Sequence, residues 1–259
     1  MEQIYYLFSK YYHNLLLANI DSNSFDNISE LLIKKYIHTF RVINNTKEIC
    51  LRENLDNTTT KQAEITALFH DIGRFTQAIE FGHFRDNLSF DHAEKSADIF
   101  LEFKNTLLQH LTRTELYTIE QSIRYHNKIK LPNGLSKDVE TVCNILRDAD
   151  KINILSINLK SDFITFDGKD KKIDIINPVC LSDFYNHQVI KSSDIKSHLD
   201  NNIKLLSWIY DFNYKTSLNM YIEEGFIDII TNTANITDLD VIKAINSAKE
   251  YALSYIKNI

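Results

Sequence analysis

Backbone breakers are scarce in this chain, and their scarcity limits the folds that it can adopt. Only five glycines and two prolines occur among its 259 residues. Sheets built from many short strands need frequent turns that contain these residues, whereas long helices need few of them. Because 44% of the residues are hydrophobic, the chain also has enough apolar side chains for a sizeable core. We therefore expect a mainly helical protein.

Apolar residues recur at helical spacing along most of the sequence. Residues 72–90, rich in Phe, Arg, Asp and Gly, are the exception and are expected to form a long loop. Helix starts are marked by two capping boxes, Thr59 with Gln62 and Thr112 with Glu115, and by two single caps, Ser136 and Thr237. The expected helices cover residues 2–20, 27–53, 60–71, 91–104, 112–127, 137–158, 181–190, 194–212, 215–231 and 238–257.

One segment departs from the helical pattern. Residues 163–166 and 172–176 are rich in β-branched and aromatic residues, and they flank the turn Asp167-Gly168-Lys169-Asp170. An Asp-Gly turn between two such runs is typical of a β-hairpin. The predicted class is therefore all-α, with a small β-hairpin insertion near 163–176 and a helical C-terminal extension.

Charge and composition exclude several classes of function. The net charge is −6 and no cluster of Lys and Arg occurs, so tight binding of duplex nucleic acid is not expected. No apolar run approaches the roughly 18 residues that span a bilayer, and the first residues do not resemble a signal peptide. The three cysteines are an odd number without a close pair, which favours free thiols in a reducing compartment. These cysteines are Cys50, Cys143 and Cys180. We expect a cytoplasmic protein that binds no membrane.

The segment Ala67-Leu68-Phe69-His70-Asp71-Ile72-Gly73-Arg74 carries the strongest chemical signal. Adjacent side chains on a regular helix diverge by roughly 100°. His70 and Asp71 can therefore face one metal ion only near a helix end or distortion. Gly73 follows directly, where a helix is expected to stop. Imidazole and carboxylate groups are ligands that divalent transition metals accept.

Four further residues extend this signal. His38 lies in an apolar helix about thirty residues before the His-Asp pair, and Asp150 lies in the segment Arg147-Asp148-Ala149-Asp150-Lys151. Between them, His92 begins one predicted helix and His126 ends another. Side chains brought together from separate helices are what a catalytic divalent metal needs.

This arrangement resembles the HD-domain metal-dependent phosphohydrolases. That family has an apolar helix, the His-Asp pair, an aliphatic residue, Gly, and Lys or Arg, and it ends its ligand set with Asp in an Ala-Asp-basic context. The resemblance covers residues 30–155. It implies a helical bundle, here a single HD-type domain over 1–259, with a metal-binding core at about 30–155 and a helical elaboration at about 156–259.

The resemblance also implies a ligand set and its neighbours. Six ligands suit two metal ions, with Asp71 bridging them. Asp148 would contact a ligand histidine on the side away from the metal and so orient its ring. A mixed nitrogen and oxygen set suits Mn²⁺, Fe²⁺, Co²⁺, Ni²⁺ or Zn²⁺. The implied ligands are His38, His70, Asp71, His92, His126 and Asp150.

The implied activity is hydrolysis of a phosphate ester of a nucleotide or another small phosphorylated metabolite, by metal-activated water. Catalysis would then involve His70, Asp71 and Arg74, whose planar guanidinium suits bidentate contact with phosphate. We expect further substrate contacts from three residues. These are His83, Arg85 and Lys151.

Three alternatives stay open at this stage. A cyclic nucleotide or cyclic dinucleotide phosphodiesterase would use the same centre, although the Gly-Tyr-Pro motif of one cyclic-dinucleotide branch is replaced by Leu131-Pro132-Asn133-Gly134. A di-iron HD oxygenase would use a similar ligand set. A non-catalytic nucleotide sensor would keep the pocket without turnover. Sequence does not distinguish monoester from diester cleavage, and it does not give the oligomeric state.

Overall fold

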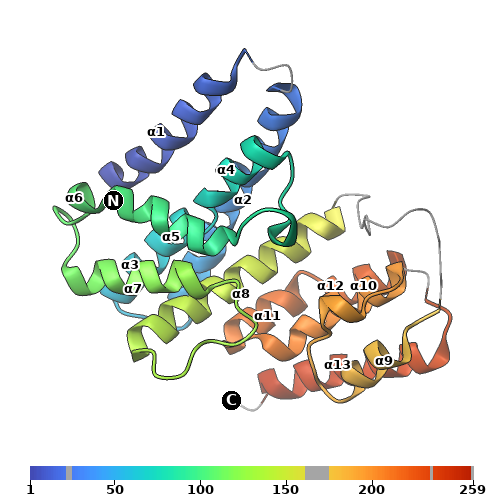
Figure 1. Cartoon of the computed structure of the whole chain (residues 1–259). Helices are drawn as coiled ribbons and strands as arrows, with labels where there is room; N and C mark the ends of the chain where they lie inside the picture. The colour runs from blue at the N-terminus through green and yellow to red at the C-terminus, as the bar shows by residue number, and fades with distance from the viewer. Residues whose placement is uncertain (22–24, 161–174, 234–235, 258–259) are drawn as a thin grey trace. The chain divides into compact units, whose positions relative to one another are not determined.

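The computed structural model describes residues 1–21, 25–160, 175–233 and 236–257 (Figure 1). No strand occurs in these ranges, and the prediction of an all-α class is confirmed for them. The predicted hairpin near 163–176 lies outside the described residues except for 175 and 176. Those two residues belong to neither a helix nor a strand.

The chain divides into two compact units, Met1–Asp150 and Lys151–Ile259. Helix α8 (Lys137–Lys160) contributes residues to both. The predicted metal-binding core, 30–155, ends near this boundary. The first unit also contains α1 (Glu2–Asn19), α2 (Phe25–Arg52), α3 (Asn57–Phe69), α4 (Ile72–Phe81), η1 (Asp86–Leu88), α5 (His92–Glu102), α6 (Lys104–Leu107) and α7 (Arg113–Tyr125). The second unit contains α9 (Pro178–Tyr185), η2 (Ser192–Asp194), α10 (His198–Ser207), η3 (Trp208–Asp211), α11 (Lys215–Glu223), α12 (Phe226–Thr233) and α13 (Leu239–Lys257).

An aromatic core holds the first unit together. Helix α2 packs on α3 and α4, and α5 packs on α4 and α7. Four fully buried rings from α1, α3, α4 and α5 meet where α3 gives way to α4, with centroids 5.9 Å apart between Phe8 and Phe69 and 5.2 Å apart between Phe69 and Phe100. Phe75 completes the group, 5.8 Å from Phe8. These contacts fix the corner between α3 and α4, which carries the His-Asp pair.

The predicted loop over 72–90 is wrong in its first half, because Ile72–Phe81 forms helix α4. Its buried residues Ile72, Phe75 and Ala78 recur every three positions, which is a helical period. Gly73 lies inside this helix instead of ending α3. A Cβ on it would lie 2.8 Å from the backbone oxygen of His92, so glycine is what allows α4 to approach α5 closely. The helix ends at Gly82, whose φ of 67° is left-handed.

Two predicted helix caps are wrong. The side chain of Asp56, not Thr59, caps α3, because its Oδ1 accepts the backbone N–H groups of the residues two and three positions later. The proposed box of Thr59 with Gln62 is therefore absent. At α13 the cap is Asp238 instead of Thr237, since Asp238 Oδ1 accepts from the backbone of Asp240 at 2.9 Å. In both cases a carboxylate close to the predicted residue is the acceptor, as expected from the helix dipole.

Two other predicted caps are confirmed. Thr112 and Glu115 form a complete capping box at α7, with Thr112 N–H donating to Glu115 Oε2 at 2.7 Å and Glu115 N–H donating to Thr112 Oγ1 at 3.2 Å. Ser136 Oγ accepts from Val139 N–H at 3.3 Å before α8. The starts of α7 and α8 are thus encoded in the local sequence.

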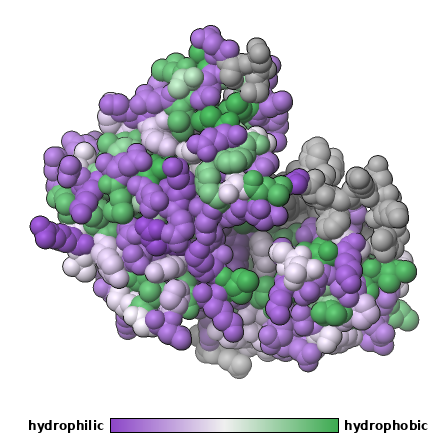
Figure 2. Space-filling model, viewed as in Figure 1, coloured by the Kyte–Doolittle hydropathy of each residue, from purple (hydrophilic) through white to green (hydrophobic). Residues whose placement is uncertain are grey.

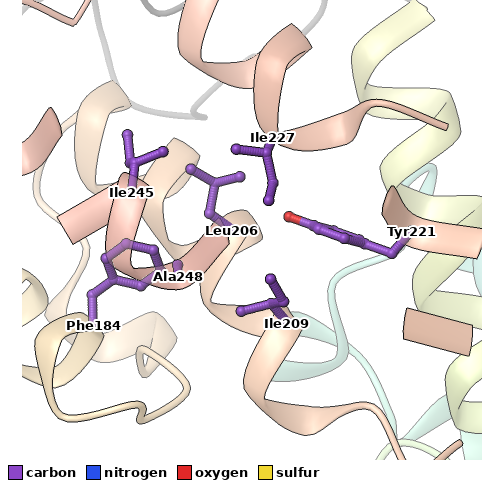
Figure 3. Close-up of a pocket in the computed structure, with 7 residues that line it drawn as sticks. All are labelled: Phe184, Leu206, Ile209, Tyr221, Ile227, Ile245 and Ala248. Atoms are coloured by element: carbon purple, nitrogen blue, oxygen red, sulfur yellow. The ribbon is translucent and has the colours of Figure 1, made fainter. Parts of the chain in front are cut away.

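The second unit is helical with a small apolar core. The predicted helix over 215–231 is interrupted at Gly225, which has φ 69° and separates α11 from α12. The predicted helix over 194–212 begins at His198 and changes to a 3₁₀ helix at Trp208. Figure 3 shows the apolar side chains that line a small pocket in this core, and the Tyr221 hydroxyl points among them. The lining residues are Phe184, Leu206, Ile209, Tyr221, Ile227, Ile245 and Ala248.

The surface and the thiols agree with the composition. All three cysteines are buried and free, as predicted. In the visible face of Figure 2, hydrophilic residues predominate and hydrophobic ones form separate groups. Among the described residues, every helix is too short or too polar to cross a bilayer.

Candidate metal centre

The His-Asp pair occupies the corner between α3 and α4. His70 is the C-cap of α3, and Asp71 is the N-cap of α4 with φ −112° and ψ 15°, outside helical geometry. This confirms the expected helix distortion, because a regular helix would turn the two side chains apart. Both are buried, His70 completely and Asp71 at 4% exposure.

A first cluster joins α2, the end of α3 and α8. His38 Nε2 lies 3.3 Å from His70 Nε2 and 3.2 Å from Asp150 Oδ1, and His70 Nε2 lies 4.0 Å from the same oxygen. The Asp150 Oδ1 atom is buried and accepts no hydrogen bond from the part of the chain that the structure describes. One ligand atom from each of these residues lies within 4.8 Å of the other two, as a metal ion requires.

A second cluster contains Asp71 and two histidines, His92 and His126. His92 Nε2 lies 3.2 Å from His126 Nε2 and 3.4 Å from Asp71 Oδ1. The other carboxylate oxygen, Asp71 Oδ2, lies 3.4 Å from His38 Nε2 and 3.6 Å from His70 Nε2 in the first cluster. Asp71 therefore presents one oxygen to each histidine pair, as a carboxylate shared by two metal ions would.

Hydrogen bonds on the far side of three rings set the direction of their lone pairs. His70 and His126 each end a helix, and each Nδ1 lies 2.7 Å from the backbone oxygen three residues earlier, a carbonyl left unpaired in the last turn. His92 Nδ1 lies 2.5 Å from Asp86 Oδ2. Because Nδ1 donates to these acceptors, Nε2 keeps its lone pair and directs it at the clusters.

The pKa shifts of His70, His126 and Asp71 favour the forms that bind a cation. Burial lowers the pKa of His70, and burial with the neighbouring His92 and His70 lowers the pKa of His126 to about 3. Burial works against ionisation of Asp71, but Lys35 and His70 hold its pKa well below the usual range. At His38 the net shift is upward. Burial alone would lower its pKa, but the neighbouring carboxylates of Asp150 and Asp71 outweigh burial and raise it. Neutral imidazoles and an ionised carboxylate are the forms that bind metal.

Two residues of the centre are absent from the sequence-based prediction. Asp86, in η1, holds His92 through Oδ2 and accepts from Arg74 Nη1 at 2.6 Å through Oδ1. Lys35, on α2, donates from Nζ to Asp71 Oδ2 at 2.6 Å. Lys35 lies three positions before His38, a spacing that places both on one face of the helix and could have indicated it. Asp86 ends the segment Gly82-His83-Phe84-Arg85-Asp86, from which only His83 and Arg85 were predicted as site residues.

Arg74 makes contacts within the first unit that differ from a simple phosphate clamp. Besides Asp86, its Nη1 donates to Gln77 Oε1 at 2.6 Å and to the backbone oxygen of Phe84 at 2.7 Å. Its Nε lies 3.6 Å from Asp71 Oδ1. Arg74 thus connects α4 to the loop that carries Asp86.

The other predicted site residues lie in different settings. His83 is half-buried and its Nδ1 accepts from the backbone N–H of Arg85, whose side chain is exposed. Asp148 is fully buried in α8. Lys151 belongs to the second unit, where its Nζ lies 2.6 Å from Asp211 Oδ2. Their assigned roles remain predictions.

Comparison with known families supports the interpretation of this centre. Residues 36–154 match the model of the HD domain. Comparisons with curated proteins and with solved structures gave no match. The matched segment begins just before His38 and ends just after Asp150, so it contains both clusters. Residues 36–154 therefore match the HD domain, the domain shared by a superfamily of metal-dependent phosphohydrolases.

Proposed function

We propose that this protein is a metal-dependent hydrolase that cleaves a phosphate ester of a nucleotide or another small phosphorylated metabolite. HD domains are mostly metal-dependent hydrolases. The observation that carries the proposal is the position of Asp71, with one carboxylate oxygen on each of two histidine pairs. An isolated structural histidine cluster would not need a shared carboxylate of this kind.

The chemistry of the donors fits two transition-metal ions. His38, His70 and Asp150 would hold one ion, His92 and His126 would hold the other, and Asp71 would contact both. Four imidazoles with two carboxylates suit Mn²⁺, Fe²⁺, Co²⁺, Ni²⁺ or Zn²⁺ better than Mg²⁺ or Ca²⁺. When bound, such ions supply Lewis-acid catalysis, which polarises a phosphoryl oxygen and makes water a stronger nucleophile near neutral pH.

The surrounding residues prepare this centre. The backbone oxygens of Ala67 and Ile123 hold the rings of His70 and His126, so these rings need little reorganisation when an ion binds. Arg74 acts through Asp86, which in turn orients His92. These contacts support a positioning role for Arg74 in place of the direct phosphate contact expected from the sequence.

The experiment is a hydrolysis screen of the Mn²⁺-loaded protein, with Asp71→Ala as the inactive control. The substrates are nucleoside monophosphates, nucleoside triphosphates, cyclic mononucleotides and cyclic dinucleotides, with products separated by chromatography. Release of inorganic phosphate from monophosphates indicates a monoesterase, and linear products from cyclic substrates indicate a phosphodiesterase. A protein that binds Mn²⁺ but hydrolyses no phosphate ester, and consumes dioxygen when loaded with Fe²⁺, would overturn the proposal in favour of an oxygenase.

A further inference from the structure

A lysine ammonium group contacts the central carboxylate of the candidate metal centre. Lys35 Nζ lies 2.6 Å from Asp71 Oδ2, and the side chain of Lys35 is 19% exposed whereas that of Asp71 is 4% exposed. Lys35 is therefore the more exposed partner of this ion pair. Among described residues that face Asp71, it is the cation nearest to this oxygen, since Arg74 Nε lies 3.6 Å from the other one.

The oxygen that Lys35 contacts is also the one that faces the first histidine pair. Asp71 Oδ2 lies 3.4 Å from His38 Nε2 and 3.6 Å from His70 Nε2. A divalent ion held by these nitrogens would need the same oxygen. Two positive charges that share one carboxylate oxygen in a buried setting repel each other strongly. The contact of Lys35 with Asp71 and the binding of an ion at this position therefore compete.

In the same position, the ammonium group of Lys35 has a second partner beside the centre. Its Nζ lies 5.4 Å from the centroid of the Phe84 ring, which is within range of a cation–π contact. Phe84 is half-buried in the segment between α4 and η1. The flexible four-carbon stem of lysine allows the ammonium group to leave Asp71 without movement of α2. It would then remain next to the ions and partly exposed, where an approaching anion meets it.

We propose that the ammonium group of Lys35 exchanges partners when a metal ion binds. In the metal-free protein it neutralises Asp71, and it releases Oδ2 when a divalent ion binds. It then binds the phosphate group of the substrate. The inference rests on the proposed function because it takes a phosphate ester as the substrate. It assigns the phosphate contact to a lysine, a compact point charge that can change partners, whereas the nearby Arg74 is held by Asp86.

The test compares Lys35→Met with Lys34→Met, a neighbouring lysine that pairs with Glu30 on the exposed face of α2. Mn²⁺ affinity is measured by calorimetry on the metal-free proteins. Binding of inorganic phosphate is then measured on the Mn²⁺-loaded proteins. In Lys35→Met we expect Mn²⁺ to bind roughly tenfold more tightly and phosphate roughly tenfold more weakly than in the wild type. Lys34→Met should match the wild type in both.

Each outcome has one meaning. If Lys35→Met binds Mn²⁺ no more tightly than the wild type, or binds phosphate equally well, the exchange is refuted. If the wild type itself binds no Mn²⁺, the proposed function fails instead, so the two failures are distinguishable. Should Lys35→Met not fold without metal, Lys35→Gln removes the charge but keeps a hydrogen-bond donor for Asp71. The same two changes are expected of it, and wild-type values in Lys35→Gln would refute the proposal.

Discussion

Asp86 Oδ2 lies 2.5 Å from His92 Nδ1, and this contact connects a residue between two helices to the second histidine pair. The carboxylate is itself held, since Arg74 Nη1 lies 2.6 Å and Gln77 Nε2 lies 3.1 Å from its other oxygen. Burial opposes ionisation of Asp86, but His92 and Arg74 lower its pKa, so it accepts hydrogen bonds throughout the neutral range.

Replacement of Asp86 should therefore weaken metal binding without unfolding the protein. In Asp86→Asn the ring of His92 loses its charged acceptor, and loss of such a partner typically costs about 10–100-fold in metal affinity. Mn²⁺ calorimetry measures the change, and circular dichroism reports the fold. Asp98→Asn is a matched control, because Asp98 is 65% exposed on α5, the helix that His92 begins, and contacts Arg124. Equal Mn²⁺ affinity in the two variants would contradict a positioning role for Asp86.

Metal binding should stabilise the folded chain through linkage. An ion that binds only the folded state adds about 2.7 kcal/mol at a concentration of 100 times Kd. Mn²⁺ should therefore raise the Tm of the wild type, and EDTA should reverse the rise. In Asp71→Ala or His70→Ala the Tm should not respond to Mn²⁺. A full Mn²⁺-dependent rise in either variant would show that the ion binds elsewhere.

The packing of α4 on α5 makes a prediction about glycine. In Gly73→Ala the new Cβ would lie 2.8 Å from the His92 oxygen and 2.9 Å from the Ser96 nitrogen, so the helices must separate, at a cost of about 1–3 kcal/mol in stability. Gly82→Ala meets no atom but keeps a left-handed φ, which costs about 1 kcal/mol. Urea unfolding should rank Gly73→Ala as the less stable variant. The reverse order would mean that α5 adapts easily.

The low pKa of His126 predicts loss of stability in acid for the metal-free protein. Its pKa is lowered to about 3, whereas the unfolded chain takes up this proton near pH 6.5. The unfolded state therefore gains the proton first as pH falls, and the free energy of unfolding decreases from pH 7 to pH 5 by on the order of 1 kcal/mol for this group. His38 has the opposite shift, so its stabilisation is lost as pH rises.

The comparison of His126→Asn with the wild type isolates the contribution of His126. Urea unfolding in EDTA at pH 7 and pH 5 should show a smaller acid loss in His126→Asn. The control His13→Asn changes an exposed histidine of α1 and should behave as the wild type. Identical pH dependence in all three proteins would be evidence that His126 is protonated as easily in the folded chain as in the unfolded one.

The sequence predicted the ligand-bearing helices well because their signals are local. His38 lies in a strongly periodic helix, and the capping box at Thr112 begins the helix that ends at His126. The adjacency of His70 and Asp71 required a distorted helix, and the corner between α3 and α4 satisfies that requirement.

The errors arise where tertiary packing decides. Gly73 appeared to be a helix terminator, but its lack of a side chain serves the contact between α4 and α5, which no local pattern reveals. Asp86 and Lys35 gain their roles only when the chain folds and brings them to His92 and Asp71. In isolation, a loop aspartate and a helical lysine resemble ordinary solvated residues.

The corner between α3 and α4 has one further consequence, for insertions and deletions. His70 closes one helix and Asp71 opens the next, so no connecting residue lies between them. One additional residue there would rotate everything after it by roughly 100° about the helix axis, and one fewer would merge the two helices. Most connections between helices in proteins tolerate changes in length. This one has no spare length, so its two residues and their order are fixed together with the helices on either side.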